Sequence, residues 1–217
     1  MIVISESMPV VIGVDHGYGN IKTANVCFPT GVTVYDTEPT FKNDLLVFEG
    51  RHYTIGTGHK EFTPDKNMDS DFYILTLAAV ARELKLRGMT SAQVFLAAGL
   101  PLTWVGQQKE QFKAYLLTHE IVDFSFRGTE YHIGVADAEV FPQGFSAVAN
   151  QLRSFHGANM LCDIGNGTMN ILGIENCKPN PEKCYTEKFG TYQCTLAAKV
   201  RIAQFRTLCV FGLNSYS

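Results

Sequence analysis

The chain has 217 residues, of which 46% are hydrophobic and 18% are charged, as in ordinary globular proteins. A chain of this length can bury roughly 70% of its unfolded surface, which is enough for one large domain or two small ones. The net charge of -3 excludes the strong positive field of proteins that bind nucleic acid or anionic membranes directly.

The lack of recognisable targeting signals and the pattern of the cysteines indicate a cytoplasmic protein. No apolar run reaches the roughly 18 residues of a membrane span, and the N-terminus has no basic segment followed by a long apolar one. The six cysteines include no Cys-x-x-Cys pair and have apolar neighbours, so we expect buried, reduced thiols.

The first quarter of the chain predicts short strands. Val10 to Val14 is continuously apolar and β-branched, which is typical of a central strand, and Ile21 to Val26 follows as its hairpin partner. Three more runs predict a β-meander that extends this hairpin: Val32 to Tyr35, Leu45 to Phe48 and His52 to Ile55.

Helices and strands alternate in the middle of the chain. Phe72 to Leu86 is apolar almost all round, so we expect a helix packed against a sheet, capped by Ser70 and its neighbours and ended by Gly88. The other expected elements are a buried strand at Gln93 to Ala98, a surface helix at Val105 to Leu117, and a hairpin of Ile121 to Phe126 with Tyr131 to Val140.

The last third begins at the break Pro142-Gln143-Gly144. Apolar residues then recur at helical spacing as far as Phe155, and Ala158 to Cys162 with Thr168 to Ile174 predicts a second hairpin. We expect a Pro-rich turn at Cys177 to Pro181, a strand at Cys184 to Lys188, and a helix whose apolar stripe runs from Tyr192 to Ala203 and is not continued cleanly beyond.

A carboxylate followed by two glycines one residue apart occurs twice in the chain. Asp15 leads into Gly17 and Gly19, and Asp163 leads into Gly165 and Gly167, each time between two strands. Such a turn bares backbone N–H groups that can bind an anion. A single copy fits an ordinary hairpin turn equally well, but two copies indicate two facing phosphate clamps in an α/β protein.

These residues carry a resemblance to a known fold. Ile12 to Lys22 looks like the first phosphate loop of the actin fold, and Leu161 to Thr168 looks like the second. Gly99 to Thr103 and Val140 to Gln143 resemble, more narrowly, the ParM/StbA family of plasmid-segregation actins. The similarity runs from about Val11 to Ala203.

The resemblance implies an α/β, actin-like (ribonuclease H-like) fold. Residues 1–157 would form domain I with the first phosphate loop, and residues 158–217 the beginning of domain II with the second. It further implies that domain II continues beyond Ser217, including the Gly-rich segment that holds adenine and ribose. On this interpretation the chain is C-terminally truncated.

The resemblance also implies ATP or GTP with Mg²⁺ as cofactors. Asp15 and Asp163 would hold a hydrated Mg²⁺, Lys22 would contact the phosphates, and Gln143 would orient the attacking water, so that Gln143 and Asp163 are the candidate catalytic residues. Lys22 could instead be a solvated strand residue, Gln143 a helix-start residue without chemistry, and Asp15 and Asp163 turn-capping carboxylates. The candidate phosphate-binding residues are Asp15, Gly17, Tyr18, Gly19, Asn20, Lys22, Gly165, Asn166, Gly167 and Thr168.

The function implied by the resemblance is nucleotide hydrolysis coupled to filament formation. Such a protein would associate with itself and segregate a plasmid or another DNA element through an adaptor protein, without binding DNA or membrane directly. One alternative is a phosphotransferase of the sugar-kinase branch, with an acidic base near Pro101 to Trp104 or Gln143. Another is a non-catalytic remnant that caps the filaments of a full-length relative.

Overall fold

The structure is a computed structural model, which describes residues 8–57 and 70–213, with side chains as far as residue 202. Its strands form two sheets, one of nine strands in the order β3-β2-β1-β7-β9-β8-β5-β6-β4 and one of three in the order β10-β11-β12. The nine strands are β1 (Val10–His16), β2 (Asn20–Lys22), β3 (Cys27–Pro29), β4 (Val32–Tyr35), β5 (Leu45–Phe48), β6 (Arg51–Ile55), β7 (Ser91–Leu100), β8 (Ile121–Phe126) and β9 (Thr129–Pro142).

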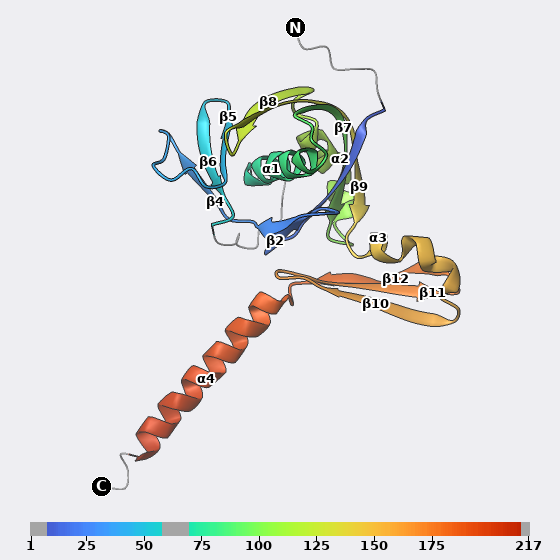
Figure 1. Cartoon of the computed structure of the whole chain (residues 1–217). Helices are drawn as coiled ribbons and strands as arrows, with labels where there is room; N and C mark the ends of the chain where they lie inside the picture. Colours follow the sequence, from blue (N-terminus) through green and yellow to red (C-terminus); the bar gives the residue numbers. More distant parts are fainter. Residues whose placement is uncertain (1–7, 58–69, 214–217) are drawn as a thin grey trace.

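The nine-stranded sheet curls around helix α1 (Asp71–Leu86), as Figure 1 shows. Most of α1 is buried, because its apolar residues face the curled sheet on several sides, and Gly88 ends it with a positive φ of 68°. Helix α2 (Val105–Leu116) covers β9 and β7 and buries Phe112 and Leu116 in the same core. The predicted buried and surface helices are therefore confirmed, although the side chain of Ser70 makes no capping hydrogen bond.

The three strands of the predicted meander form, but they do not make a meander, since β4 pairs with β6 rather than with β5, and their place in the sheet was also wrong. Strands β4, β6 and β5 pair in that order, and β5 joins β8 rather than the first hairpin. The partner of β1 is also shorter than predicted, since β2 ends at Lys22 and a turn leads into β3. A strand's neighbours depend on contacts between distant segments, which local patterns of hydrophobicity do not encode.

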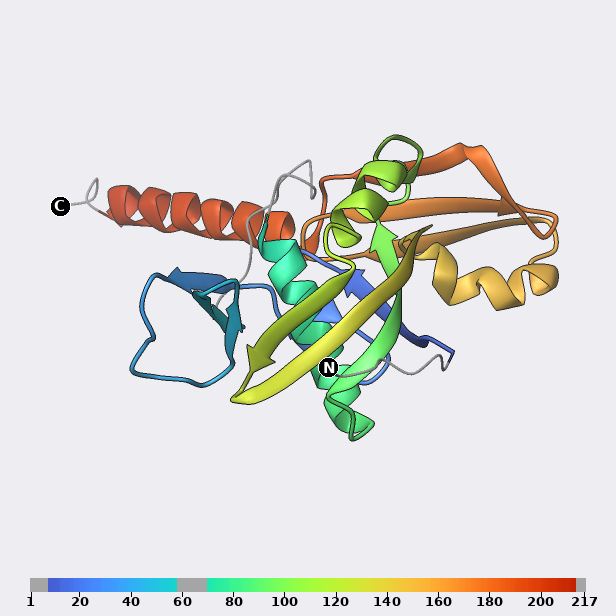
Figure 2. The ribbon, with the colours of Figure 1, turned by 90° about the horizontal axis from the view of Figure 1, so that it is seen from above.

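The three-stranded sheet comprises β10 (Ala158–Ile164), β11 (Met169–Glu175) and β12 (Lys178–Glu187), and Figure 2 shows it beside the larger sheet. The predicted second hairpin is confirmed as β10 and β11. The predicted Pro-rich turn was wrong, because the turn lies at Asn176 and Cys177, both with positive φ, and Pro179 and Pro181 belong to β12. Proline is tolerated there because β12 is an edge strand, which need not donate every ladder hydrogen bond.

Helices precede and follow the three-stranded sheet along the chain. The apolar segment after Gln143 forms one turn of α-helix, α3 (Phe145–Val148), followed by a 3-10 helix, η1 (Ala149–Ser154). Helix α4 (Thr191–Leu213) is longer than its apolar stripe predicted, and it extends away from both sheets in Figure 1. Tyr192, Leu196 and Val200 of that stripe are exposed.

The surface differs from the prediction at the cysteines. Cys27, Cys162 and Cys194 are exposed rather than buried, and no disulfide involves a cysteine whose side chain is described.

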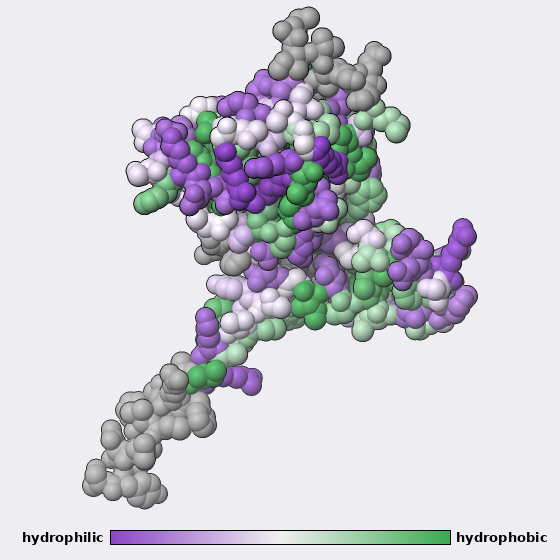
Figure 3. All heavy atoms as spheres, in the orientation of Figure 1, coloured by the Kyte–Doolittle hydropathy of each residue, from purple (hydrophilic) through white to green (hydrophobic). Residues whose placement is uncertain are grey.

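Exposed apolar residues, among them Met160 and Ile164, lie along β10, and hydrophobic surface is visible over the three-stranded sheet in Figure 3. Within the described parts of the chain, no helix is both long and apolar enough to cross a membrane.

Candidate functional site

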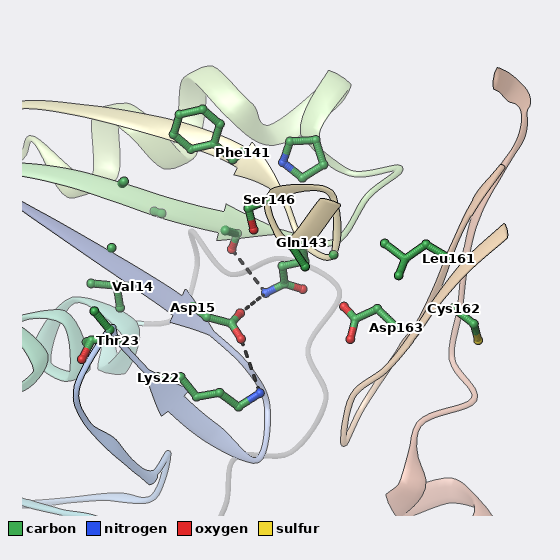
Figure 4. Close-up of a pocket in the computed structure, with 18 residues that line it drawn as sticks. Val14, Asp15, Lys22, Thr23, Phe141, Gln143, Ser146, Leu161, Cys162 and Asp163 are labelled. Carbon is green, nitrogen blue, oxygen red and sulfur yellow. Dashed lines mark hydrogen bonds and ion pairs between the residues drawn. The ribbon is translucent and has the colours of Figure 1, made fainter. Parts of the chain in front are cut away.

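A cavity of about 550 Å³ lies between the two sheets, where β1, β7 and β9 end near β10. Its charged and polar side chains include Asp15, Lys22, Gln143 and Asp163, four residues that the sequence had singled out. Figure 4 shows that Asp15 and Gln143 approach the cavity from the large sheet and Asp163 from the small one. Residues more than a hundred positions apart in sequence thus meet in one place.

Asp15 is held by neighbours on both sides. It lies opposite Lys22 in the antiparallel pair β1–β2 and beside Gly99 in the parallel pair β1–β7. The ammonium Nζ of Lys22 is 3.5 Å from Oδ2 of Asp15, and Nε2 of Gln143 donates a hydrogen bond of 2.9 Å to Oδ1. The two oxygens of one carboxylate therefore each have their own partner.

Two glycines allow these side chains to converge, and neither of them was among the predicted site residues. A Cβ atom on Gly99 would lie 3.1 Å from Cγ of Gln143, and one on Gly144 would lie 3.2 Å from Cβ of Asp163. Gly144 also has a φ of 79°, which a residue with a side chain rarely adopts. The signal for Gly144 was its place after the Pro142-Gln143 break.

Asp163 belongs to β10 and faces Asn170 across the pair β10–β11. Nδ2 of Asn170 donates a hydrogen bond of 3.4 Å to Oδ2 of Asp163. Asn170 is 4% exposed, a low value for an amide, and no pattern in the sequence had marked it.

The two Gly-rich turns pack against one another rather than lining the cavity. A Cβ atom on Gly19 would lie 2.9 Å from Cβ of Asn166, and one on Gly167 would lie 2.8 Å from the ring of Tyr18. The N–H of Gly165 donates to the carbonyl of its own turn at Thr168, 2.8 Å away. The candidate phosphate-binding residues outside the cavity lining are Gly17, Tyr18, Gly19, Asn20, Gly165, Asn166, Gly167 and Thr168.

The turn that follows Lys22 is fixed by Glu83 of α1. This carboxylate is 1% exposed, and it accepts hydrogen bonds from the hydroxyl of Thr23 and from the backbone and side-chain N–H groups of Asn25. Burial opposes ionisation, but these hydrogen bonds and the charge of Arg87 outweigh it, so the pKa of Glu83 is lowered. A buried ionised group thus anchors the segment that carries Lys22.

Comparison with known proteins decides the family. The sequence profile described as "Actin like proteins N terminal domain" matches residues 13–145, more than half of the chain. The chain belongs to the actin-like protein family. The matched segment of this actin-like protein includes Asp15, Lys22 and Gln143 and ends before Asp163. Among curated proteins, none matches the chain significantly.

Solved structures agree on the fold of this actin-like protein. The AlfA filament bound to AMPPNP has a TM-score of 0.67 at 17% identity, covering 85% of this chain and 71% of that one. Ta0583, an archaeal actin homolog in complex with ADP, has a TM-score of 0.65 at 19% identity, covering 90% and 66%. A 15-stranded ParM filament from Clostridium botulinum has a TM-score of 0.63 at 19% identity, covering 84% and 65%. The predicted actin-like α/β fold is confirmed, and the chain spans less than two thirds of the length of the last two.

Proposed function

We propose that this actin-like protein binds a nucleoside triphosphate with Mg²⁺ in the cavity between its two sheets and hydrolyses it. The observation that carries the proposal is the convergence of Asp15, Gln143 and Asp163 on one cavity. Two carboxylates suit a divalent cation, and Lys22 beside Asp15 supplies a positive charge for phosphate oxygens. ATP and GTP fit this chemistry equally, since none of these groups reads a base.

The residues present fit Mg²⁺. This ion takes oxygen ligands, keeps several waters and is commonly bound through one or two carboxylates together with substrate phosphates. Asp15 and Asp163 are such carboxylates, and they line the same cavity from opposite sheets. Within residues 8–57 and 70–202, no three His, Cys, Asp or Glu side chains group as metal ligands. Bound Mg²⁺ would neutralise charge on the phosphates.

The chain's own residues would position the reactants. Gln143 would hold Asp15 through its amide N–H and orient a water molecule near the terminal phosphate, a role that needs no strong base. The two Gly-rich turns pack against one another outside the cavity lining, so their backbone N–H groups would contact the phosphates only after the turns separate on binding. Because Gly165 already donates within its own turn, binding would engage other N–H groups of that turn or rearrange it.

We also propose that the chain works in the cytoplasm as part of a filament that segregates a plasmid or another DNA element through an adaptor protein. In support, the similar AlfA and ParM structures are filaments, and AMPPNP and ADP are bound in the AlfA and Ta0583 structures. Residues 1–157 would act as the first domain and 158–217 as part of the second. A sugar-kinase activity would need an acidic base in addition to the Mg²⁺ ligands. The acidic residues in the cavity lining are Asp15 and Asp163, and both are already proposed as Mg²⁺ ligands, which favours the filament protein.

The deciding experiment compares Asp163→Ala with the wild type by calorimetric titration of AMPPNP with and without Mg²⁺. A matched control is Asp36→Ala, because Asp36 is exposed and lies outside the cavity. We expect Asp163→Ala to weaken Mg²⁺-dependent binding by roughly 10-fold or more, the loss of one charge-assisted contact, and Asp36→Ala to change nothing. Equal binding by Asp163→Ala and the wild type would refute the site.

Phosphate release and pelleting separate the functions. Release of phosphate together with pelleting after ATP addition supports the segregation filament. Release that requires a sugar would indicate a kinase instead. Neither activity would indicate a filament-capping protein.

A further inference from the structure

The loop that follows β7 is seated against the three-stranded sheet by a buried amide. The side chain of Leu102 packs with the apolar cluster of Val148, Leu172 and Ile174, which lies under that sheet. The backbone N–H of Leu102 donates a hydrogen bond of 3.2 Å to Oδ1 of Asn170. A loop of the large sheet is thus fixed to the small sheet by both its side chain and its backbone.

A second bond reinforces the same contact. The hydroxyl of Thr186 on β12 donates to Oδ1 of Asn170 at 2.8 Å and accepts the backbone N–H of Thr103 at 3.2 Å. Two consecutive N–H groups of the loop are therefore linked by hydrogen bonds to a single amide oxygen, one of them directly and the other through the hydroxyl of Thr186.

These contacts fix which way the amide of Asn170 faces. A backbone N–H can only donate, so the atom opposite Leu102 must be the oxygen. The nitrogen Nδ2 then faces the carboxylate of Asp163, 3.4 Å away. An amide can accept from the loop on one side and donate to the carboxylate on the other, whereas an ionised carboxylate in its place could only accept.

We propose that Asn170 is a positioning residue, which transmits the seating of the Pro101–Trp104 loop to the Asp163 carboxylate and so aligns the two sheets around the cavity. The consequence for ligand binding rests on the proposed function, whereas the contact between loop and sheet does not. Because Asn170 is 4% exposed, water cannot readily replace its bonds. The separation between the two halves of the site is therefore set partly by one side chain.

Four variants separate the two halves of the network, and the first, Asn170→Ala, removes both the acceptor that faces Leu102 and the donor that faces Asp163. Asn170→Asp keeps the size and the acceptor that faces Leu102 but replaces the donor facing Asp163 with a second carboxylate oxygen. Thr186→Val removes the link to Thr103 and leaves the contact with Asp163 in place. Asn180→Asp is the matched control, since Nδ2 of Asn180 also donates to a carboxylate of this sheet, that of Glu175 at 3.0 Å, outside the cavity.

The first readout needs no ligand. Amide hydrogen exchange followed by NMR should show the N–H of Leu102 protected in the wild type, in Asn170→Asp and in Asn180→Asp, and exchanging at least 10-fold faster in Asn170→Ala. Thr186→Val should release the N–H of Thr103 to a similar extent. Unchanged protection in Asn170→Ala would overturn the proposed contact.

The second readout is the affinity for AMPPNP with Mg²⁺. We expect Asn170→Asp to lose about 10-fold or more although its loop stays protected, because a merely structural role would be preserved in this variant. Asn180→Asp should bind like the wild type. Affinity of Asn170→Asp at or above the wild-type value would overturn the positioning role, whereas absence of binding by the wild type would refute the proposed function and leave the exchange result to decide the contact.

Discussion

The amide nitrogen Nε2 of Gln143 donates a hydrogen bond of 2.9 Å to Oδ1 of Asp15. Gln143 lies just beyond β9 and Asp15 near the end of β1, so this bond ties two strand ends that β7 separates. A side chain held in this way loses little further rotamer freedom when it positions a reactant. The same residue can therefore serve both the carboxylate and the water.

Replacing Gln143 with alanine should slow hydrolysis more than it weakens binding. We expect the rate of phosphate release at saturating ATP to fall roughly 10- to 100-fold, because positioning of the water is lost. The affinity for AMPPNP should fall less, since Lys22 still contacts Asp15. Single-turnover phosphate release and calorimetry measure the two quantities.

The control for this change is Gln151→Ala, which alters an exposed glutamine on η1. It should leave both quantities unchanged. If Gln143→Ala weakens binding but releases phosphate at the wild-type rate, Gln143 only supports Asp15 and the water must be oriented by another group.

Contact between the two Gly-rich turns gives a second prediction. A Cβ atom on Gly19 would lie 2.9 Å from Cβ of Asn166, closer than carbon atoms pack, so Gly19→Ala should destabilise the fold by about 1–3 kcal/mol. Asn166→Gly removes the opposing Cβ and should restore part of this loss in the double variant. Urea unfolding of the single and double variants measures the coupling.

Asn166→Ala supplies the matched control for that cycle. It removes the amide but keeps the Cβ atom that causes the clash, so it should not rescue Gly19→Ala. Rescue by alanine and glycine alike would mean that the Asn166 amide, rather than the contact between the turns, causes the strain.

The sequence predicted most elements because their signals are local. Hydrophobic runs predicted the strands, and the apolar residues almost all round α1 predicted its burial. Both signals can be read from residues that are close together in the sequence. The repeated Asp-x-Gly-x-Gly pattern led to Asp15 and Asp163, which do line one cavity.

The features that could not be predicted from the sequence depend on contacts between segments that are far apart in the chain. The junction of β5 with β8, the seat of Leu102 on Asn170 and the packing of one Gly-rich turn on the other each join segments that are far apart in the chain. Asn170 follows its motif as an ordinary strand residue, and only burial together with three hydrogen bonds distinguishes it. The prolines of β12 misled because proline marks turns more often than edge strands.

Glu83 should make the fold sensitive to acid. The pKa of this carboxyl is lowered in the folded chain, so its stabilising effect is present above the pKa of the unfolded chain and is lost as the pH falls through the folded value. Glu83→Gln keeps the shape but weakens the bonds from Thr23 and Asn25, and it should cost about 1–3 kcal/mol at neutral pH. The free energies of unfolding of wild type and variant should converge as the pH falls through the lowered pKa of Glu83, because the wild-type carboxyl is then protonated.

Glu110→Gln, a change of an exposed residue on α2, is the control and should cost less than about 0.5 kcal/mol at neutral and at acidic pH. If the difference in free energy of unfolding between wild type and Glu83→Gln stays constant or widens on acidification, the anchoring role is contradicted, because only an ionised Glu83 binds its partners more strongly than the amide does.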